Sequence, residues 1–246
     1  MINLMTSTLS SSLRCWAGTS SSKVTVQPGL PLILYDREAC PRARLVREAL
    51  TELNLDVEIR PCPLGSERFI NDVPTGRTPY LLDPNTQKTF TTTGKILHYL
   101  FYHYAGKNVP AKLRPGLINL TTSSLASTLR LNAGNRKKPG KPAARALRLF
   151  SFESSPYSRP VRELLSELEL RYLLINIGKQ QWSDMGPANF RLGLGQYMPL
   201  PDTKRSAFFA QHGNVQVPYL EDPNTDSHLF ESKDIIEYLN NEYATL

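Results

Sequence analysis

The chain has 246 residues, of which 40% are apolar and 21% charged, a balance that is ordinary for globular domains and leaves room for two of about 100 residues each. Its three cysteines, Cys15, Cys40 and Cys62, are too few and too scattered for a disulfide framework, and no pair has metal-ligand spacing, so we expect a reducing compartment and no metal. No apolar stretch approaches the roughly 20 residues that cross a bilayer, so no transmembrane span is expected.

The net charge of +7 is distributed unevenly along the chain. Residues 1–35 and 106–146 together contain eleven basic residues and no acidic one, so the rest of the chain, with 18 basic and 22 acidic residues, carries −4. A basic face on a folded domain is therefore not expected. The basic stretch at 106–146 also lacks interleaved aromatic residues, and no nucleic-acid partner is predicted.

The first thirty residues contain eleven Ser or Thr, two basic residues and no carboxylate. This is the composition of an organelle transit peptide, and a disordered Ser-rich tail is the alternative. Because arginine is sparse, the plastid is favoured over the mitochondrion. The composition therefore predicts that residues 1–30 lie outside the fold and that the protein resides in the chloroplast, in the stroma or at the thylakoid surface.

Two stretches of the chain are repeated. Residues 32–55 match 147–170 without a gap, with twelve identities in 24 positions, and residues 78–105 match 217–244 with twelve identities in 28. The offset changes from 115 to 139, so the second copy has a longer middle. Self-similarity of this kind predicts a duplicated structural unit.

The repeat predicts similar domains at 31–105 and 147–246, with a linker at 106–146. In each copy an apolar run leads through a polar turn into a helix, at 42–53 and 157–168, whose apolar residues recur at helical spacing. A strand follows and completes a βαβ unit. Next come Thr-Pro-Tyr or Val-Pro-Tyr, an Asp-Pro-Asn-Thr turn, another strand and a closing helix.

This order, with Cys-Pro at the start of the first helix and a proline before the third strand, resembles the thioredoxin superfamily. More narrowly it is similar to the N-terminal domain of glutathione transferases and glutaredoxins, in a tandem arrangement found in cyanobacteria and in plant and algal plastids. The resemblance covers residues 32–105 and 147–244. It implies an α/β fold of two thioredoxin-like domains of βαβ-αββα order, without the all-helical C-terminal domain of a glutathione transferase.

Cys40 is the candidate nucleophile of the first copy. It precedes Pro41 at the expected start of a helix, where free N–H groups, the helix dipole and two nearby arginines favour a thiolate. The resemblance makes Cys40 the counterpart of the glutaredoxin nucleophile. Ala43 stands where dithiol members carry a second cysteine, so only monothiol exchange through a glutathione mixed disulfide is open to it. A buried, inert cysteine is the alternative.

The second copy has Ser155 at the matching place. A serine there has no neighbouring base in the sequence pattern, and its hydroxyl does not ionise unaided. The resemblance to hydroxyl-type glutathione transferases implies that Ser155 donates a hydrogen bond to a glutathione sulfur. Capping of the helix is the plainer role.

The resemblance also implies contacts to glutathione at a strand end. In this family the backbone before a conserved proline pairs with the tripeptide, and the proline is cis. These positions are Thr78 and Pro79 in the first copy, and Val217 and Pro218 in the second.

A Glu-Ser pair at the start of the last helix binds the γ-glutamyl end of glutathione in the family. It is present as Glu231-Ser232 in the second copy and replaced by Thr92-Thr93 in the first. Ser232 is also suited to capping the helix. Because the first copy keeps the thiol and the second keeps the carboxylate, either the copies share one composite site or both have become scaffolding.

The linker is expected to be a flexible, cationic stretch. Within it, Leu117, Ile118, Leu120, Leu125 and Leu129 alternate with Ser and Thr, which predicts an amphipathic helix resting on the two domains, on a partner or on an anionic membrane surface.

Two functions remain open. One is a glutathione-linked thiol transferase of low activity, with Cys40 as nucleophile, glutathione as cofactor and protein thiols as partners. The other is a non-catalytic accessory or structural subunit of a large membrane-associated organelle complex, attached through the basic linker.

Overall fold

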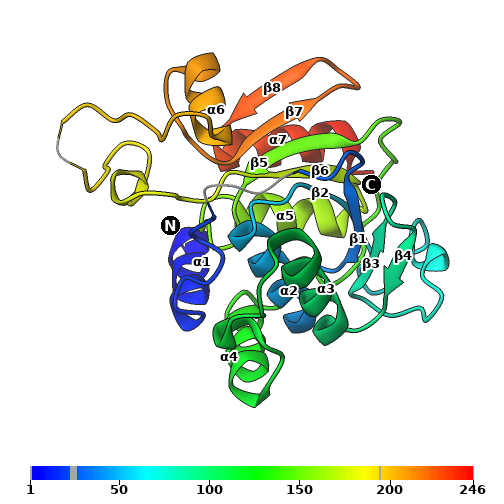
Figure 1. The fold of residues 1–246 in the computed structure, drawn as a ribbon. Coiled ribbons are helices and arrows are strands. Elements are labelled where there is room, and N and C mark those ends of the chain that lie inside the picture. The colour runs from blue at the N-terminus through cyan, green and yellow to red at the C-terminus, as the bar shows by residue number, and fades with distance from the viewer. Residues whose placement is uncertain (1, 23–26, 194, 246) are drawn as a thin grey trace.

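The computed structural model describes residues 2–22, 27–193 and 195–245 and shows a mixed α/β fold on an eight-stranded sheet of order β4-β3-β1-β2-β6-β5-β7-β8 (Figure 1). The strands are β1 (Leu32–Asp36), β2 (Val57–Pro61), β3 (Tyr80–Asp83), β4 (Lys88–Phe90), β5 (Leu147–Ser151), β6 (Tyr172–Asn176), β7 (Tyr219–Asp222) and β8 (Ser227–Phe230). The helices are α1 (Ile2–Leu13), α2 (Pro41–Glu52), α3 (Thr93–Ala105), α4 (Leu117–Thr128), α5 (Arg159–Glu167), α6 (Lys204–His212) and α7 (Ser232–Tyr243), with short 3₁₀ turns η1 (Ile70–Asp72), η2 (Ala111–Leu113) and η3 (Trp182–Asp184).

The strand order is the same from either edge of the sheet to its middle. β1 pairs parallel with β2 and antiparallel with β3, just as β5 pairs parallel with β6 and antiparallel with β7. α2 packs against α3, and α5 against α7. This arrangement is thioredoxin-like, and the predicted α/β fold class is confirmed.

The two halves join through β2 and β6, which pair antiparallel with Val57 opposite Leu174 and Ile59 opposite Tyr172. The pairing satisfies the backbone groups that each half would otherwise leave on an open sheet edge. Beneath the sheet, Leu50 of α2 and Leu165 of α5 belong to one apolar core and are fully buried. The helical faces predicted from the sequence therefore form a core that both halves share.

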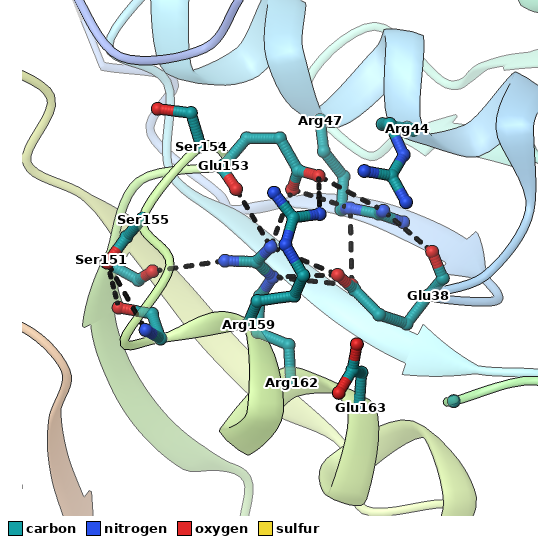
Figure 2. Close-up of polar contacts among 12 residues, drawn as sticks. Glu38, Arg44, Arg47, Ser151, Glu153, Ser154, Ser155, Arg159, Arg162 and Glu163 are labelled. Carbon is teal, nitrogen blue, oxygen red and sulfur yellow. Dashed lines mark hydrogen bonds and ion pairs between the residues drawn. The ribbon is translucent and has the colours of Figure 1, made fainter. Parts of the chain in front are cut away.

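Four buried charged side chains, Glu38, Arg47, Glu153 and Arg162, fill the junction between α2 and α5 (Figure 2). Arg47 Nε lies 2.9 Å from Glu153 Oε2, and Arg162 Nη2 lies 3.0 Å from Glu38 Oε1. Each arginine also donates a 2.9 Å hydrogen bond to the backbone carbonyl of the glutamate in its own half. Each guanidinium thus binds both halves, and pairing offsets the cost of burying these charges.

Two segments that we call the arms cross this junction. The first arm, residues 2–22, contains α1, and the second arm, residues 118–138, contains all but the first residue of α4. Arg14 of the first arm is 2.7 Å from Glu48, and Arg130 of the second is 2.6 Å from Glu163.

Beyond these ion pairs, each arm bonds to the opposite half of the molecule. In the first arm, the Ser21 amide donates to the carbonyl of Lys179 at 2.9 Å. In the second, the amide of Lys137, which matches Ser21, donates to the carbonyl of Leu64 at 3.0 Å. The arms therefore hold the two halves together by the same contacts on both sides.

The prediction that residues 1–30 lie outside the fold is wrong where the structure describes them. Ser10 Oγ donates to the Ala126 carbonyl at 2.9 Å and Ser11 Oγ to the Ser154 carbonyl at 2.7 Å, and both serines are buried. These two serines are small enough for close packing, and their hydroxyls have backbone partners. Residues 1 and 23–26 of that prediction lie outside the described residues, and the plastid location stays a prediction.

The basic end of the linker is not a free cationic stretch either. Its lysines pair with glutamates of the two halves: Lys137 with Glu67, Lys138 with Glu167 and Lys141 with Glu242, at 2.5, 2.6 and 2.8 Å. These ion pairs tie residues 137–141 of the linker to the two halves, which corrects the flexibility expected there.

Three large apolar side chains of α4, Leu117, Ile118 and Leu125, face outward, while Leu120 packs against the shared core. Leu117 is 86% and Ile118 77% exposed, whereas Ser123, Ala126 and Ser127 are buried. The small side chains face inward because Ser127 Oγ accepts a 3.0 Å hydrogen bond from the buried guanidinium of Arg44, which an aliphatic side chain could not do. In the described part of the chain, no helix has the length and apolar character to cross a membrane.

Candidate functional site

The two helix starts that the sequence singles out differ in accessibility and partners. Cys40 is the N-cap of α2, with Pro41 at the first helical position, and it is 5% exposed. Arg44, one of the two arginines expected to favour a thiolate, turns its guanidinium toward Ser10 and Ser127 of the arms.

Ser155 begins the helical turn that precedes α5. Its Oγ accepts hydrogen bonds from the Ser158 amide at 3.2 Å and from the Ser158 hydroxyl at 2.9 Å. The cap-like role is therefore present. Since a hydroxyl has two acceptor sites and one proton, these contacts use its lone pairs and leave its proton for a ligand.

The two prolines at the family's cis-proline position are both preceded by cis peptide bonds, Thr78-Pro79 and Val217-Pro218, as expected. Pro79 precedes β3 and Pro218 precedes β7, at equivalent ends of the two halves. Val217 and Thr78 are both half-buried.

Glu231 and Ser232 lie where β8 passes into α7. Glu231 has a left-handed backbone with φ of 64°, and its carboxylate accepts a hydrogen bond from Gln216. Ser232 does not cap α7 but donates at 2.7 Å to the carbonyl of Tyr157, and so ties α7 to the turn before α5. In the first half, Thr93 makes the same kind of bond to the carbonyl of Arg42, at 3.4 Å.

A cavity of about 830 Å³ brings the site residues of the second half together. Its lining includes the residues predicted there, Ser155, Val217, Pro218, Glu231 and Ser232. Cys40, Thr78 and Pro79 do not line it. The geometry therefore excludes a composite site in this cavity that would use Cys40.

The first arm and the long segment before β7 supply the rest of the cavity wall. Cys15 and Trp16, just after α1, line it together with Lys179, Arg191 and Arg205. The cavity thus depends on the longer middle of the second copy and on the segment that the composition placed outside the fold.

Three of the basic residues in the cavity wall have one carboxylate partner between them. Arg205 pairs with Asp184, Nε to Oδ1 at 3.4 Å. Lys179 instead donates to the carbonyl of Gly186, and Arg191 to two backbone carbonyls and an amide oxygen; no ion pair of either is found in the described part of the chain. Burial, together with the charges of Arg205 and Arg191, lowers the pKa of Lys179 to about 8. The excess positive charge suits an anionic ligand.

Cys62, which follows β2, is buried. Burial, with the nearby carboxylates of Asp36 and Glu169, raises the pKa of its thiol to about 12. A thiol with such a pKa stays protonated and does not act as a nucleophile.

Sequence reasoning missed Cys15 and the basic residues of the cavity. Lys179, Arg191 and Arg205 are far apart in the chain, and no spacing links them. The sequence does contain a sign that the first arm is an ordered, repeated segment. Residues 2–18 match 118–134 at eleven of 17 positions, including Arg14 with Arg130 and Gly18 with Gly134. The repeat therefore begins earlier than the strands.

A helix start beside a cis-proline strand end defines a thioredoxin-like domain, and in the second half a cavity with basic residues adjoins both. The chain belongs to the family of the glutathione S-transferase N-terminal domain, which it matches over residues 34–108 and again over 149–245. No curated protein and no solved structure matches the chain.

Proposed function

We propose that the second half of this protein binds glutathione in the cavity beside Ser155, and that the first half is a scaffold. The observation that carries this proposal is the position of Glu231 and Ser232 in the same cavity as Ser155 and Val217. The cavity volume of about 830 Å³ lies within the range of small-molecule sites.

The charges of the cavity suit this ligand. Glutathione has an ammonium group and a carboxylate at its γ-glutamyl end, a carboxylate at its glycine end and a thiol between them. Glu231 is available to the ammonium group, while Lys179 and Arg191, which form no ion pair with the described residues, offer positive charge to carboxylates. The backbone of Val217 precedes the cis-proline, where the family pairs with the peptide.

Ser155 gives the site its chemistry. A hydroxyl proton directed at the sulfur stabilises the thiolate of a bound thiol more than its protonated form, and so raises its nucleophilicity at neutral pH. Ser155 does not itself exchange disulfides. We therefore expect the second half to bind and activate glutathione, with low turnover.

Calorimetric titration of the full chain with reduced glutathione tests the proposal. Glu231→Gln removes a charge-assisted bond and should weaken binding about tenfold or more. Glu237→Gln, which changes an exposed carboxylate of the same helix that does not line the cavity, should bind like the unmodified protein. The absence of binding to the unmodified chain, or equal affinities of the two variants, would contradict it.

One observation favours a second function, that of an accessory subunit of a membrane-associated plastid complex. The outward side chains Leu9 of α1 and Leu125 of α4 are 52% and 50% exposed, and neither helix contains a charged residue. Paired apolar faces of this kind fit a protein partner. Migration of the protein with a large assembly in native extracts, lost in the Leu9→Ser, Leu125→Ser double variant, would support this function, and migration as a free monomer would exclude it.

A further inference from the structure

We propose that Cys15 of the first arm is the redox-active thiol of the cavity in the second half, where it forms a mixed disulfide with glutathione. The inference rests on the proposed function, since glutathione must occupy the cavity. It replaces the nucleophile expected from the sequence, Cys40, by a cysteine from outside both thioredoxin-like units.

The position of Cys15 is fixed by the arm. Its amide donates to the Ser12 carbonyl at 2.8 Å, and the Trp16 amide donates to the Ser11 carbonyl at 2.9 Å. Directly before it, Arg14 is bound to the buried Glu48. The exposed thiol therefore stands on anchored backbone at the cavity wall.

The fold does not require a cysteine at this place. The matching residue of the second arm is Leu131, whose left-handed φ of 52° is close to the 48° of Cys15. The same backbone thus forms around a leucine. The thiol is special to the arm that faces the cavity with Glu231 and Ser155.

Ser155 is the second residue of the cavity wall that indicates a ligand. Its side chain is 1% exposed, lines the cavity, and has its two acceptor sites occupied by Ser158. Its remaining proton is suited to a sulfur atom of the ligand.

The exchange uses glutathione disulfide as the oxidant. The Cys15 thiolate, formed by loss of its proton to solvent, attacks one sulfur of glutathione disulfide. The bond between Cys15 and that sulfur forms as the original disulfide bond breaks, and one glutathione thiolate leaves and takes up a proton. Reduced glutathione reverses the step by attack on the mixed disulfide.

The proposal is tested by the rate of modification, because any exposed cysteine reacts slowly with disulfides and modification alone would not indicate a site. The full chain is incubated with glutathione disulfide or with the small neutral hydroxyethyl disulfide, and peptide mass spectrometry identifies the modified cysteine. We expect one glutathionyl group per chain, on Cys15. Its rate with glutathione disulfide should fall about tenfold in Glu231→Gln and stay unchanged in Glu237→Gln, whereas the rate with hydroxyethyl disulfide should be the same in both.

Three outcomes would overturn the proposal: modification of Cys40 in place of Cys15, undiminished modification of Cys15→Ser, or a glutathione disulfide rate that does not respond to Glu231→Gln. Calorimetry with reduced glutathione on Cys15→Ser separates the two claims. If Cys15→Ser binds glutathione but the original protein is not glutathionylated selectively at Cys15, only the role of Cys15 is contradicted. If the original protein does not bind glutathione, the proposed glutathione site itself is contradicted.

Discussion

The two halves of this molecule share a framework and differ at the site. Both present a helix start beside a cis-proline strand end, and both anchor an arm through a buried arginine. In the first half, η1 lies between β2 and β3, and Cys40 is buried. In the second, the corresponding segment is longer, contains η3 and α6, and adds basic residues to a cavity. The comparison shows that the fold of a thioredoxin-like half does not by itself form this cavity; the longer segment before β7 and the first arm complete its wall.

The junction is the feature on which both halves depend, and disrupting it should have the largest effect. Arg47→Met removes the guanidinium that pairs with Asp36 and Glu153 and leaves both carboxylates buried. We expect the free energy of unfolding to fall by about 3–5 kcal/mol. Urea unfolding measures it, with Lys141→Ala as control, since the exposed pair of Lys141 with Glu242 is worth about 1 kcal/mol or less. A loss no greater than that of the control would show that the junction is not what stabilises the protein.

The arms should be equivalent in stability although only one lines the cavity. Arg14→Met leaves the buried Glu48 without its arginine partner, and Arg130→Met does the same to Glu163. Each should lower the free energy of unfolding, measured in urea, by about 3 kcal/mol. If the first arm were a dispensable leader, Arg14→Met would be close to neutral while Arg130→Met remained costly.

Ligand binding should break the equivalence of the helix starts. Ser155→Ala removes the hydroxyl donor of the cavity and should weaken glutathione binding about fivefold, the value of one hydrogen bond. Cys40→Ala, the matched change in the first half, should leave the dissociation constant unchanged in calorimetry. The reverse pattern would place the site in the first half.

The smallest effect concerns pH and Lys179, which faces the cavity in the second half only. Burial and neighbouring arginines lower its pKa to about 8 in the folded protein, against 10.5 ordinarily. Between these values the unfolded chain binds more protons, so the free energy of unfolding should rise with pH from about 8 upward. The difference in the free energy of unfolding between the original protein and Lys179→Met should therefore increase with pH. Its slope should stay well below the one-proton limit of about 1.4 kcal/mol per pH unit.

Urea unfolding at a series of pH values gives this difference. Lys95→Met, at an exposed position of α3, is the control and should follow the unmodified protein. Parallel profiles for all three proteins would mean that Lys179 titrates as it does in water.

The local pattern of the sequence was sufficient for the fold class. Val46 and Leu50 recur at helical spacing and are buried in α2, and the repeated Pro-Tyr-Leu motif gives β3 and β7. Local pattern failed where burial depends on the other half. Arg44 and Arg47 form a polar stripe on α2 that one thioredoxin-like unit would turn to solvent, yet both are buried because the opposite half and the arms supply their partners.

The candidate site could likewise be predicted only in part, because local pattern shows the motif positions but not which distant segments lie beside them. Ser155, Val217 and Glu231 occupy motif positions, and the structure brings them to one cavity. The position of Cys15 in the cavity wall could not be predicted, because its segment has the composition of a disordered tail. A high serine content does not indicate whether the hydroxyls are hydrogen-bonded to water or to buried carbonyls. Only the match of the two arms at an offset of 116 carried that information.

Backbone amide shifts of the isotope-labelled full chain, followed by NMR during titration with reduced glutathione, test the central claim most directly. We predict saturable changes at Ser155, Val217 and Ser232, with the amides of Cys40, Thr78 and Thr93 unmoved. Changes centred on Cys40 and Thr78, or none in either half, would contradict the assignment of the site to the second half.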